Sequence, residues 1–362
     1  MKRAISILLV LIMCFSVFAG CGNSGTATTT AAATTAAPTT AAATTTGAAA
    51  SGNGPVIFPE SYTFKLANAT PDGDVKDRAC KEFKRLVEER TGGSVTIEVY
   101  SGGQLGDWKD TIEGLRLGIN EIVIESLGSM SAFSDYANID TTPYIYKNYD
   151  HYMAVMQSDL FAEIMDTVTS DGGFIAFGPM YRGVRMTSCT RPFTNLAGLK
   201  GMKFRVPPSP SILETFTLLG AAPTPLALSE TFTALQQKTV EAQENAVGEA
   251  YSFGFYDVCD YLVRTDHAYS TDMFIFDRAF FHKLPAELQT ILQEAAEETA
   301  LWRSEITRGE EEDYIQKWKD EGVTVLELDD FDEFVTACEP FFDEGKFPYL
   351  KDWADRIKAF PY

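Results

Sequence analysis

Residues 198–210 read GLKGMKFRVPPSP, a short strand-like run that a pair of prolines ends. Apolar and basic side chains alternate from Met202 to Val206, so the pattern predicts a strand with one apolar face. Arg205 stands at the carboxyl end of this strand, which is the edge where open α/β sheets bind ligands. A guanidinium there is either a solvated surface group or an anchor for an anion.

Strand and helix patterns alternate on the N-terminal side of this stretch. Strands are predicted at 62–68, 94–100 and 121–126, and helices at 74–93 and 106–118, the second with Asp107 as N-cap. Gly92 and Gly93 end the first helix. This order predicts an α/β fold with a mostly parallel sheet.

The alternation continues through the second half of the chain. Residues 172–188 predict two strands joined by a turn, and 239–245 and 322–328 predict further short strands. Helices are predicted at 209–220, at 228–238 with Ser229 as N-cap, and over the long run 284–322. The last helix is far longer than average, so we expect it to bridge two domains.

Length and charge restrict the class of protein. The 362 residues are 45% hydrophobic, which is enough for two domains with their own cores. The formal net charge of -21 argues against nucleic acid and anionic lipid as partners, because both require clustered basic residues. A bound anion would need local cations to overcome this field.

The N-terminus is predicted to be a targeting segment. Two basic residues precede an apolar stretch that ends in Phe18-Ala19-Gly20-Cys21, so residues 1–21 are a secretion signal. The small residues before Cys21 resemble a bacterial lipobox, which implies a lipidated cysteine and an extracytoplasmic protein anchored to the cell membrane. Residues 22–58 are rich in Ala and Thr and predict a disordered tether.

The remaining cysteines and the histidines give no sign of a metal site or cofactor. Four cysteines are widely spaced without a CxxC pair, and the three histidines are scattered (Cys80, Cys189, Cys259, Cys338; His151, His267, His282). We expect buried free thiols, although an exported protein also permits disulfides. The motifs GxSxG, HExxH, GxGxxG and the Walker loop are absent, so the sequence predicts a binding protein and not an enzyme.

Three polar side chains at predicted strand ends form the candidate site. Arg205 is joined by Arg185, in the strand-like GVRMTS, and by Asn245, which ends TVEAQEN. Two arginines and an amide that converge would suit a small organic acid, because a guanidinium grips a carboxylate through two parallel hydrogen bonds. The periodicity alone leaves a surface role open for each arginine.

Four motifs occur in an order that resembles the solute-binding subunit of TRAP transporters, the DctP-like family. They are QLGDWKDTIEGLRLG (104–118), YRGVRMTSCTRPF (181–193), LKGMKFRVPPSP (199–210) and GAAPTPLALSETFTALQQKTVEAQEN (220–245). The resemblance runs from about Tyr62 to the end of the chain. It implies a two-lobed, periplasmic-binding-protein-like α/β fold with a long bridging helix, in which lobe I is 59–182 plus 271–310 and lobe II is 183–270 plus 311–362.

The resemblance also assigns roles to residues. Arg205 matches the arginine that pairs with the substrate carboxylate, Arg185 a second arginine at the same anion, and Asn245 a pocket amide. Further ligand contacts are implied at Asn68, Glu125 and Ser126. Glu125 would either accept hydroxyls of a sugar acid or face solvent.

Two departures from the family pattern affect the expected ligand. Leu228 stands where the family often has an aromatic residue. An extra arginine typical of sialic-acid-binding members is missing around Ser126 and Ser129, so a smaller acid is expected.

The function implied by the resemblance is capture of a small organic acid by lobe closure and its delivery to the small and large membrane subunits of a TRAP transporter. No cofactor is implied. Alternatives are a sensor partner of a membrane receptor kinase, a binding protein of an ATP-driven importer and a secreted carbohydrate-active enzyme. The sequence leaves the identity of the acid, the oligomeric state and the choice between transport and sensing open.

Overall fold

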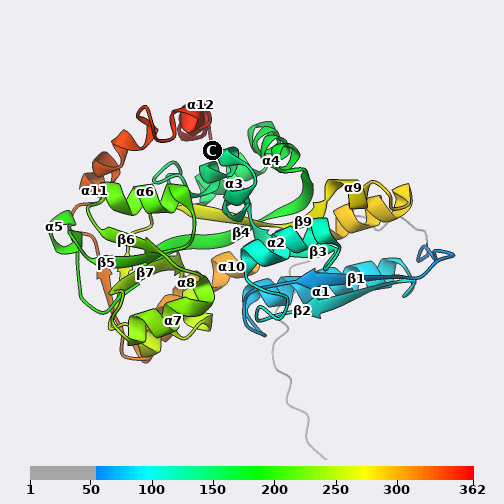
Figure 1. Ribbon diagram of the computed structural model, residues 1–362, viewed down its shortest axis with the longest axis horizontal. Helices are drawn as coiled ribbons and strands as arrows, with labels where there is room; N and C mark the ends of the chain where they lie inside the picture. Colours follow the sequence, from blue (N-terminus) through cyan, green and yellow to red (C-terminus); the bar gives the residue numbers. More distant parts are fainter. Residues whose placement is uncertain (1–53) are drawn as a thin grey trace, which may run out of the picture. The chain divides into compact units, whose positions relative to one another are not determined.

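The computed structural model describes residues 54–362 of the chain. The predicted signal peptide, Cys21 and the tether up to residue 53 lie outside the described residues. Residues 54–362 form an α/β fold with two lobes, one built on β1–β3 and the other on β5–β7 (Figure 1). We call these the first and the second lobe.

The strands follow one continuous path through both lobes, in the order β2-β1-β3-β9-β4-β7-β5-β6, with β8 and β10 paired to one side. Their bounds are β1 Tyr62–Ala67, β2 Val95–Tyr100, β3 Ile122–Ser126, β4 Phe174–Cys189, β5 Lys203–Val206, β6 Ala222–Pro225, β7 Ala242–Ala246, β8 Tyr261–Arg264, β9 Tyr269–Asp277 and β10 Thr324–Glu327.

Helices cover the sheet in both lobes. The α-helices are α1 Val75–Arg90, α2 Trp108–Leu117, α3 Tyr149–Met156, α4 Asp159–Gly172, α5 Leu196–Leu199, α6 Pro210–Leu218, α7 Leu228–Gln236, α8 Val247–Ser252, α9 Arg278–Phe281, α10 Ala286–Asp320, α11 Phe331–Ala337 and α12 Lys351–Lys358. Short 3-10 helices are η1 Leu127–Ala132, η2 Asp135–Thr141, η3 Phe255–Asp257, η4 Glu339–Phe342 and η5 Pro348–Leu350.

The sheet is mixed, and the predicted parallel arrangement holds within each lobe. Strand β1 pairs in parallel with β2 and β3, and β5 pairs in parallel with β6 and β7. The long strands β4 and β9 run antiparallel to each other and to their neighbours β7 and β3. They cross from one lobe to the other, and the alternation of strands and helices in sequence does not encode this crossing.

The prediction of two strands joined by a turn at 172–188 was wrong. Strand β4 is continuous over 16 residues, and its register shifts twice, between Phe177 and Met180 and between Tyr181 and Gly183. Gly178 has a φ of 63°, and a Cβ added there would overlap the carbonyl oxygen of Ala296 on α10. The glycines therefore mark bulges and a close approach of the helix, not a turn.

Caps at the helix ends beside the cavity agree with the sequence except in one case. Asp107 caps α2 in a capping box with Asp110, and Gly118 ends this helix in the left-handed conformation. The prediction of Ser229 as the N-cap of α7 was wrong, because the helix begins at Leu228, with Ala227 in the cap position.

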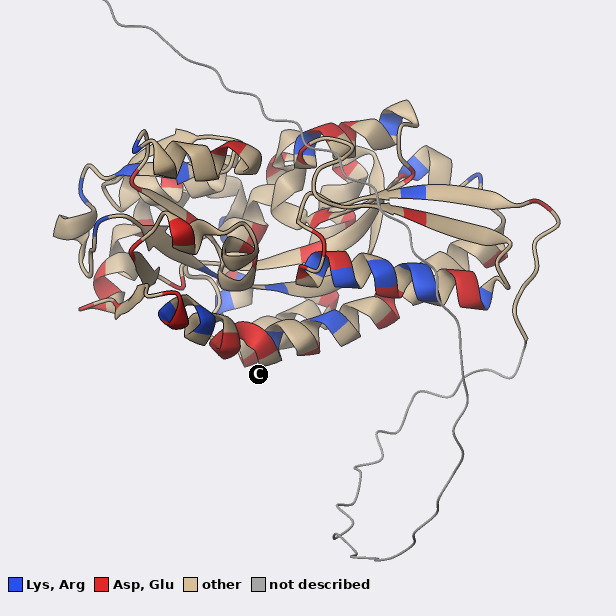
Figure 2. Cartoon of the chain, turned by 90° about the horizontal axis from the view of Figure 1, so that it is seen from below, with Lys and Arg blue, Asp and Glu red and all other residues tan. Residues whose placement is uncertain are grey.

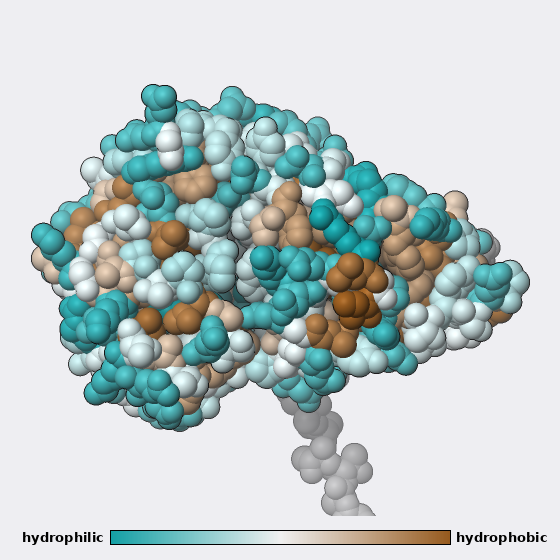
Figure 3. Space-filling model, in the orientation of Figure 1, coloured by the Kyte–Doolittle hydropathy of each residue, from teal (hydrophilic) through white to brown (hydrophobic). Residues whose placement is uncertain are grey.

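The long helix α10 spans 35 residues and contacts both lobes, as the sequence predicts. Arg78 on α1 forms an ion pair with Glu310, and the indole of Trp318 donates to the carbonyl oxygen of Val247 on α8 at 3.3 Å. Along the helices in Figure 2, basic and acidic residues are intermixed, without one continuous basic face. On the side shown in Figure 3, hydrophilic residues border the seam between the lobes.

The C-terminal segment packs against α3 and α4. Apolar side chains from Phe341 to Ile357 share a core with these helices, and Glu163 on α4 accepts hydrogen bonds from Trp353 and Arg356. The predicted lobe boundaries, which assign 311–362 to the second lobe, stay a prediction.

Candidate ligand-binding site

A cavity lies where the two lobes meet, and it is lined by residues of both. Its volume is about 60 Å³, measured by the positions that the centre of a water molecule can occupy. Charged and polar lining residues are Lys76, Asp107, Glu125, Ser126, Ser129, Thr141, Arg182, Arg185, Arg205, Ser209, Asn245 and Glu249. Trp108, Pro207, Pro208, Ile212 and Leu228 supply apolar wall, with Ala69 and Gly128 between.

Arg205 lies at the end of β5, where the sequence predicts it, and its side chain is only 2% exposed. Its Nε and Nη2 atoms donate to the carbonyl oxygen of Leu226 at 3.0 and 2.8 Å. Within residues 54–362 it has no carboxylate within 4 Å, and burial lowers its pKa to about 10. Arg205 is therefore a charged, buried guanidinium without a counter-ion.

Arg185 lines the same cavity but already has a partner. Its Nε and Nη2 atoms donate to the two carboxylate oxygens of Glu244 at 2.5 and 2.8 Å. Burial alone would raise the pKa of Glu244, but Arg185 and His267 hold it well below its usual range. Only Nη1 of Arg185 has no hydrogen bond among the described residues. A ligand would therefore meet one free donor of Arg185 and not a pair of parallel donors.

Asn245 lies on β7 and is buried beside the two arginines. Its Oδ1 accepts a hydrogen bond from the backbone of Ala246 at 2.9 Å. Its amide nitrogen has no partner in the described part of the chain and is a free donor. Three of the predicted residues, Arg205, Arg185 and Asn245, thus converge on one wall.

Glu125 and Ser126 lie at the end of β3 and line the opposite lobe's wall. Glu125 is buried, so it does not face bulk solvent, and burial raises its pKa against the opposing effect of Lys76. Its Oε2 accepts from Ser126 N at 3.2 Å and from Ser129 Oγ at 3.4 Å.

Asn68 is not among the residues that line the cavity. Its Oδ1 accepts hydrogen bonds from the backbone nitrogen and the hydroxyl of Thr70, both at 3.0 Å. This local turn occupies the side chain, and Ala69 takes the place beside the cavity.

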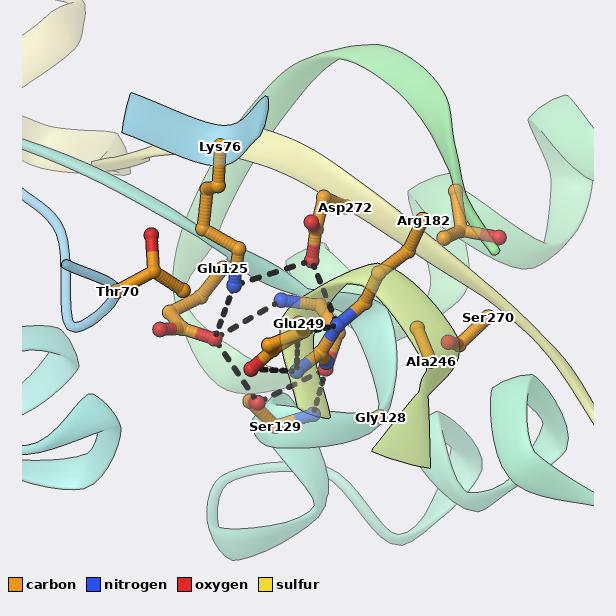
Figure 4. A network of polar contacts seen from close by, with 12 residues as sticks. Thr70, Lys76, Glu125, Gly128, Ser129, Arg182, Ala246, Glu249, Ser270 and Asp272 are labelled. Carbon is orange, nitrogen blue, oxygen red and sulfur yellow. Dashed lines mark hydrogen bonds and ion pairs between the residues drawn. The ribbon is translucent and has the colours of Figure 1, made fainter. Parts of the chain in front are cut away.

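Besides Asp107, which was predicted only as a helix cap, the sequence analysis missed three charged lining residues: Lys76, Arg182 and Glu249. They belong to a buried network that Figure 4 shows, in which Arg182 donates to both oxygens of Glu249 at 2.8 Å. Lys76 Nζ lies 3.6 Å from Glu125 and 3.5 Å from Asp272. A lysine in the first turn of a helix is usually exposed, so the sequence position of Lys76 did not indicate that it lines a cavity.

Asp272 on β9 connects the network to the long helix. Its second oxygen forms an ion pair with Arg303 on α10 at 2.7 Å. Burial would raise the pKa of Asp272, yet Lys76, Arg303 and Arg182 hold it well below its usual range. The carboxylate therefore stays ionised, and the network links the cavity wall to α10 and β9.

The apolar wall replaces the aromatic residue that the family pattern predicts at 228. Leu228 and Ile212 line the second-lobe side, and Trp108, directly after its N-cap Asp107, lines the first-lobe side. The structure therefore provides an aromatic wall from a different element than the resemblance implies.

The cysteine side chains of the described part lie in its interior. Cys80, Cys189, Cys259 and Cys338 are free and buried, as expected. Residues 54–362 contain no cluster of His, Cys, Asp and Glu that would hold a metal ion. In the same range, no helix combines the length and the apolar character needed to cross a membrane.

Comparison with known proteins agrees with this fold and cavity. Residues 66–346 match the family described as bacterial extracellular solute-binding protein, family 7 (DctP). The chain is 29% identical over 282 residues to the sialic acid-binding periplasmic protein SiaP of Vibrio cholerae, covering 78% of this chain and 88% of that protein.

Two solved TRAP periplasmic solute-binding proteins of Roseobacter denitrificans are each 26% identical. The one with bound β-D-glucuronate has a TM-score of 0.78 and covers 83% of this chain and 100% of its own. The one with bound L-galactonate has a TM-score of 0.76 and covers 81% of this chain and 99% of its own.

Two lobes around a cavity lined by both, together with the match to solved solute-binding proteins, define a solute-binding protein. The chain belongs to the bacterial extracellular solute-binding protein family 7, the DctP family. Membership confirms the resemblance, the fold class and the prediction of a binding protein in place of an enzyme.

Proposed function

We propose that this protein is the extracytoplasmic receptor of a TRAP transporter that captures a small organic acid, of the sugar-acid class, and delivers it to the membrane subunits. The observation that carries the proposal is the buried guanidinium of Arg205, which faces the cavity without a carboxylate partner. A buried cation of this kind is stabilised by an anionic ligand, and a carboxylate matches its planar donors.

Hydroxyl recognition is the second requirement of a sugar acid, and the cavity walls supply it. Ser126, Ser129, Asn245 and Glu125 offer both donors and acceptors next to the apolar surfaces of Trp108 and Ile212. The similar proteins of Roseobacter denitrificans hold glucuronate and galactonate, which are hydroxylated carboxylates.

Closure of the lobes over the ligand would couple capture to delivery. The ligand contacts both lobes in this proposal, so it favours the closed form over the open one by the free energy of those shared contacts. Arg205 and Asn245 act from the second lobe, and Glu125 and Ser126 act from the first. Transfer to membrane subunits and the lipid anchor at Cys21 complete the proposed cycle.

Ligand release and calorimetry test the proposal together. Mass spectrometry of the native protein, purified without added ligand, should detect a hydroxylated carboxylic acid that leaves on unfolding. Arg205→Met should lower the affinity for that acid at least about 100-fold, because the carboxylate loses its counter-ion while the cavity keeps its volume. Arg85→Met, on the exposed face of α1, is the matched control and should bind as the wild type does.

Unchanged affinity of Arg205→Met would contradict the assignment of the carboxylate site. Uptake of the identified acid by vesicles that carry the membrane subunits, with and without this protein, tests delivery. Labelling of the mature N-terminus by lipid, lost in Cys21→Ala, tests the anchor.

A further inference from the structure

Four cationic side chains line the cavity, and three of them face carboxylates within the protein. Arg185 is paired with Glu244, and Arg182 is paired with Glu249, each through two hydrogen bonds. Lys76 lies between two carboxylates, at 3.5 and 3.6 Å. Arg205 is the one lining cation in the described residues that has no such partner.

The cavity wall formed by the charged network is balanced in charge, and both lobes contribute to it, with Glu125 on β3 and Glu249 on α8. Three cations face three carboxylates. Lys76, Arg182, Glu125, Glu249 and Asp272 are labelled in Figure 4, and Arg303 on α10 pairs with Asp272. All six side chains are at most 10% exposed, so water screens these charges weakly. This wall has no spare positive charge for an anion.

Asp107 adds one more acceptor next to the same space. Its Oδ1 accepts the backbone hydrogen bond of Trp108 at 2.8 Å, while its Oδ2 is buried without a partner in residues 54–362. A second carboxylate on the ligand would therefore meet Asp107, Glu125 and Glu249 and find no free cation. A hydroxyl would instead donate to these oxygens.

Lys76 and Glu125 together present a donor and an acceptor side by side. The ammonium of Lys76 is 1% exposed and lines the cavity, yet it makes no hydrogen bond among the described residues. Its distances of 3.5 and 3.6 Å to carboxylate oxygens exceed those of N–H···O hydrogen bonds. A ligand hydroxyl that accepts from Lys76 and donates to Glu125 would satisfy both groups.

We propose that the cavity binds a polyhydroxylated monocarboxylate in preference to a dicarboxylate. Arg205 binds the single carboxylate, and the Lys76–Glu125 pair forms hydrogen bonds with a ligand hydroxyl at the opposite wall. The inference rests on the proposed function and names the ligand class of the same site. Selection arises because the one uncompensated cation accepts one negative charge, and a second charge would be buried against carboxylates.

Matched acids test the inference in calorimetry with the wild-type protein. Galactonate and galactarate differ in one group, a terminal hydroxymethyl in the first and a second carboxylate in the other; gluconate and glucarate form a second pair. We expect the better-bound monocarboxylate to bind about 100-fold more tightly than its dicarboxylate counterpart, as expected for a charge buried without a partner. Succinate and malate should bind no better than the aldarates.

Glu125→Gln tests the charge balance directly. The amide removes one negative charge and leaves Lys76 with Asp272 alone, so a second ligand carboxylate gains a cationic partner. The ratio of dicarboxylate to monocarboxylate affinity should rise at least about tenfold relative to the wild type. Glu287→Gln, an exposed position on α10 with the same change of charge, should leave the ratio unchanged.

Equal or tighter binding of the dicarboxylates by the wild type would overturn the inference and leave the proposed function standing. An unchanged ratio in a folded Glu125→Gln would overturn the role of the Lys76–Glu125 pair. If neither class of acid binds and no acid is released from native protein, the proposed function fails together with the inference.

Discussion

Glu244 holds the guanidinium of Arg185 by two hydrogen bonds inside the second lobe, at 2.5 and 2.8 Å. The same carboxylate lies 3.1 Å from Nε2 of His267, whose Nδ1 lies 3.0 Å from the hydroxyl of Thr265. These contacts fix Arg185 beside Arg205 while cancelling its charge. The two neighbouring arginines therefore differ in pairing: Arg185 has a carboxylate partner, whereas Arg205, which we propose as the carboxylate site, has none among the described residues.

Breaking this pair should destabilise the protein more than breaking a surface pair. In Glu244→Gln, Arg185 stays buried without a counter-charge, so we expect the free energy of unfolding to fall by about 3 kcal/mol. Urea denaturation of the ligand-free protein measures the loss. Glu82→Gln, which breaks an exposed pair with Arg85, should cost less than about 1 kcal/mol. Equal losses in the two variants would contradict a structural role for the buried pair.

The contribution of Glu244 should depend on pH with a defined sign. Its pKa is lower in the folded protein than in the unfolded chain, where a glutamate titrates near about 4.3. Stability from the ionised carboxylate is therefore fully present above that pH and is lost as the pH falls through the folded pKa. Protonation of Glu244 should therefore make the difference in unfolding free energy between the wild type and Glu244→Gln shrink below about pH 4.

Much of the binding wall could be predicted, because it depends on strand ends that the local pattern shows. Arg205 follows from an alternating strand stopped by prolines, Glu125 lies next to last in the short strand β3, and Asn245 lies next to last in β7. The residues that set the charge of the cavity depend on long-range contacts instead. Lys76 is buried only because α1 packs next to β3 and β9, and its helical spacing gives no hint of that.

Strand direction and pairing were the other features beyond local pattern. Arg185 lies on β4, opposite Ala246 of β7 in an antiparallel register, and this register brings Glu244 to its guanidinium. Residues 172–188 suggested two strands joined by a turn, and only the pairing with β9 and the packing of α10 show one strand with bulges near Gly178 and Gly183. The pairing of the Arg185 guanidinium with Glu244 therefore could not be inferred from the sequence.

A contact between the lobes should contribute to ligand affinity. The hydroxyl of Ser211 on α6 lies 2.6 Å from the hydroxyl of Thr141 on η2. The backbone nitrogen of Ser211 donates to Oδ1 of Asn138 at 3.2 Å. Because we propose that the lobes close over the ligand, loss of this hydroxyl contact in Ser211→Ala should weaken the closed arrangement, and we expect affinity to fall about fivefold through faster ligand release. Stopped-flow displacement measures the rate. Thr217→Val, whose hydroxyl bonds within α6, is the control and should release ligand at the wild-type rate.

The four cysteines of the described residues should be unreactive in the folded state. Each is buried, and burial raises the pKa of Cys259 and of Cys338 to about 12, so the nucleophilic thiolate is scarce at neutral pH. A mature chain that begins at residue 21 and carries Cys21→Ser should show no reaction with a thiol-specific chromophore at pH 8 over minutes. The same chain in concentrated guanidinium should release four equivalents. Fewer equivalents in the unfolded chain would reveal a disulfide, and rapid reaction of the native chain would show that a lobe opens far enough to expose its core.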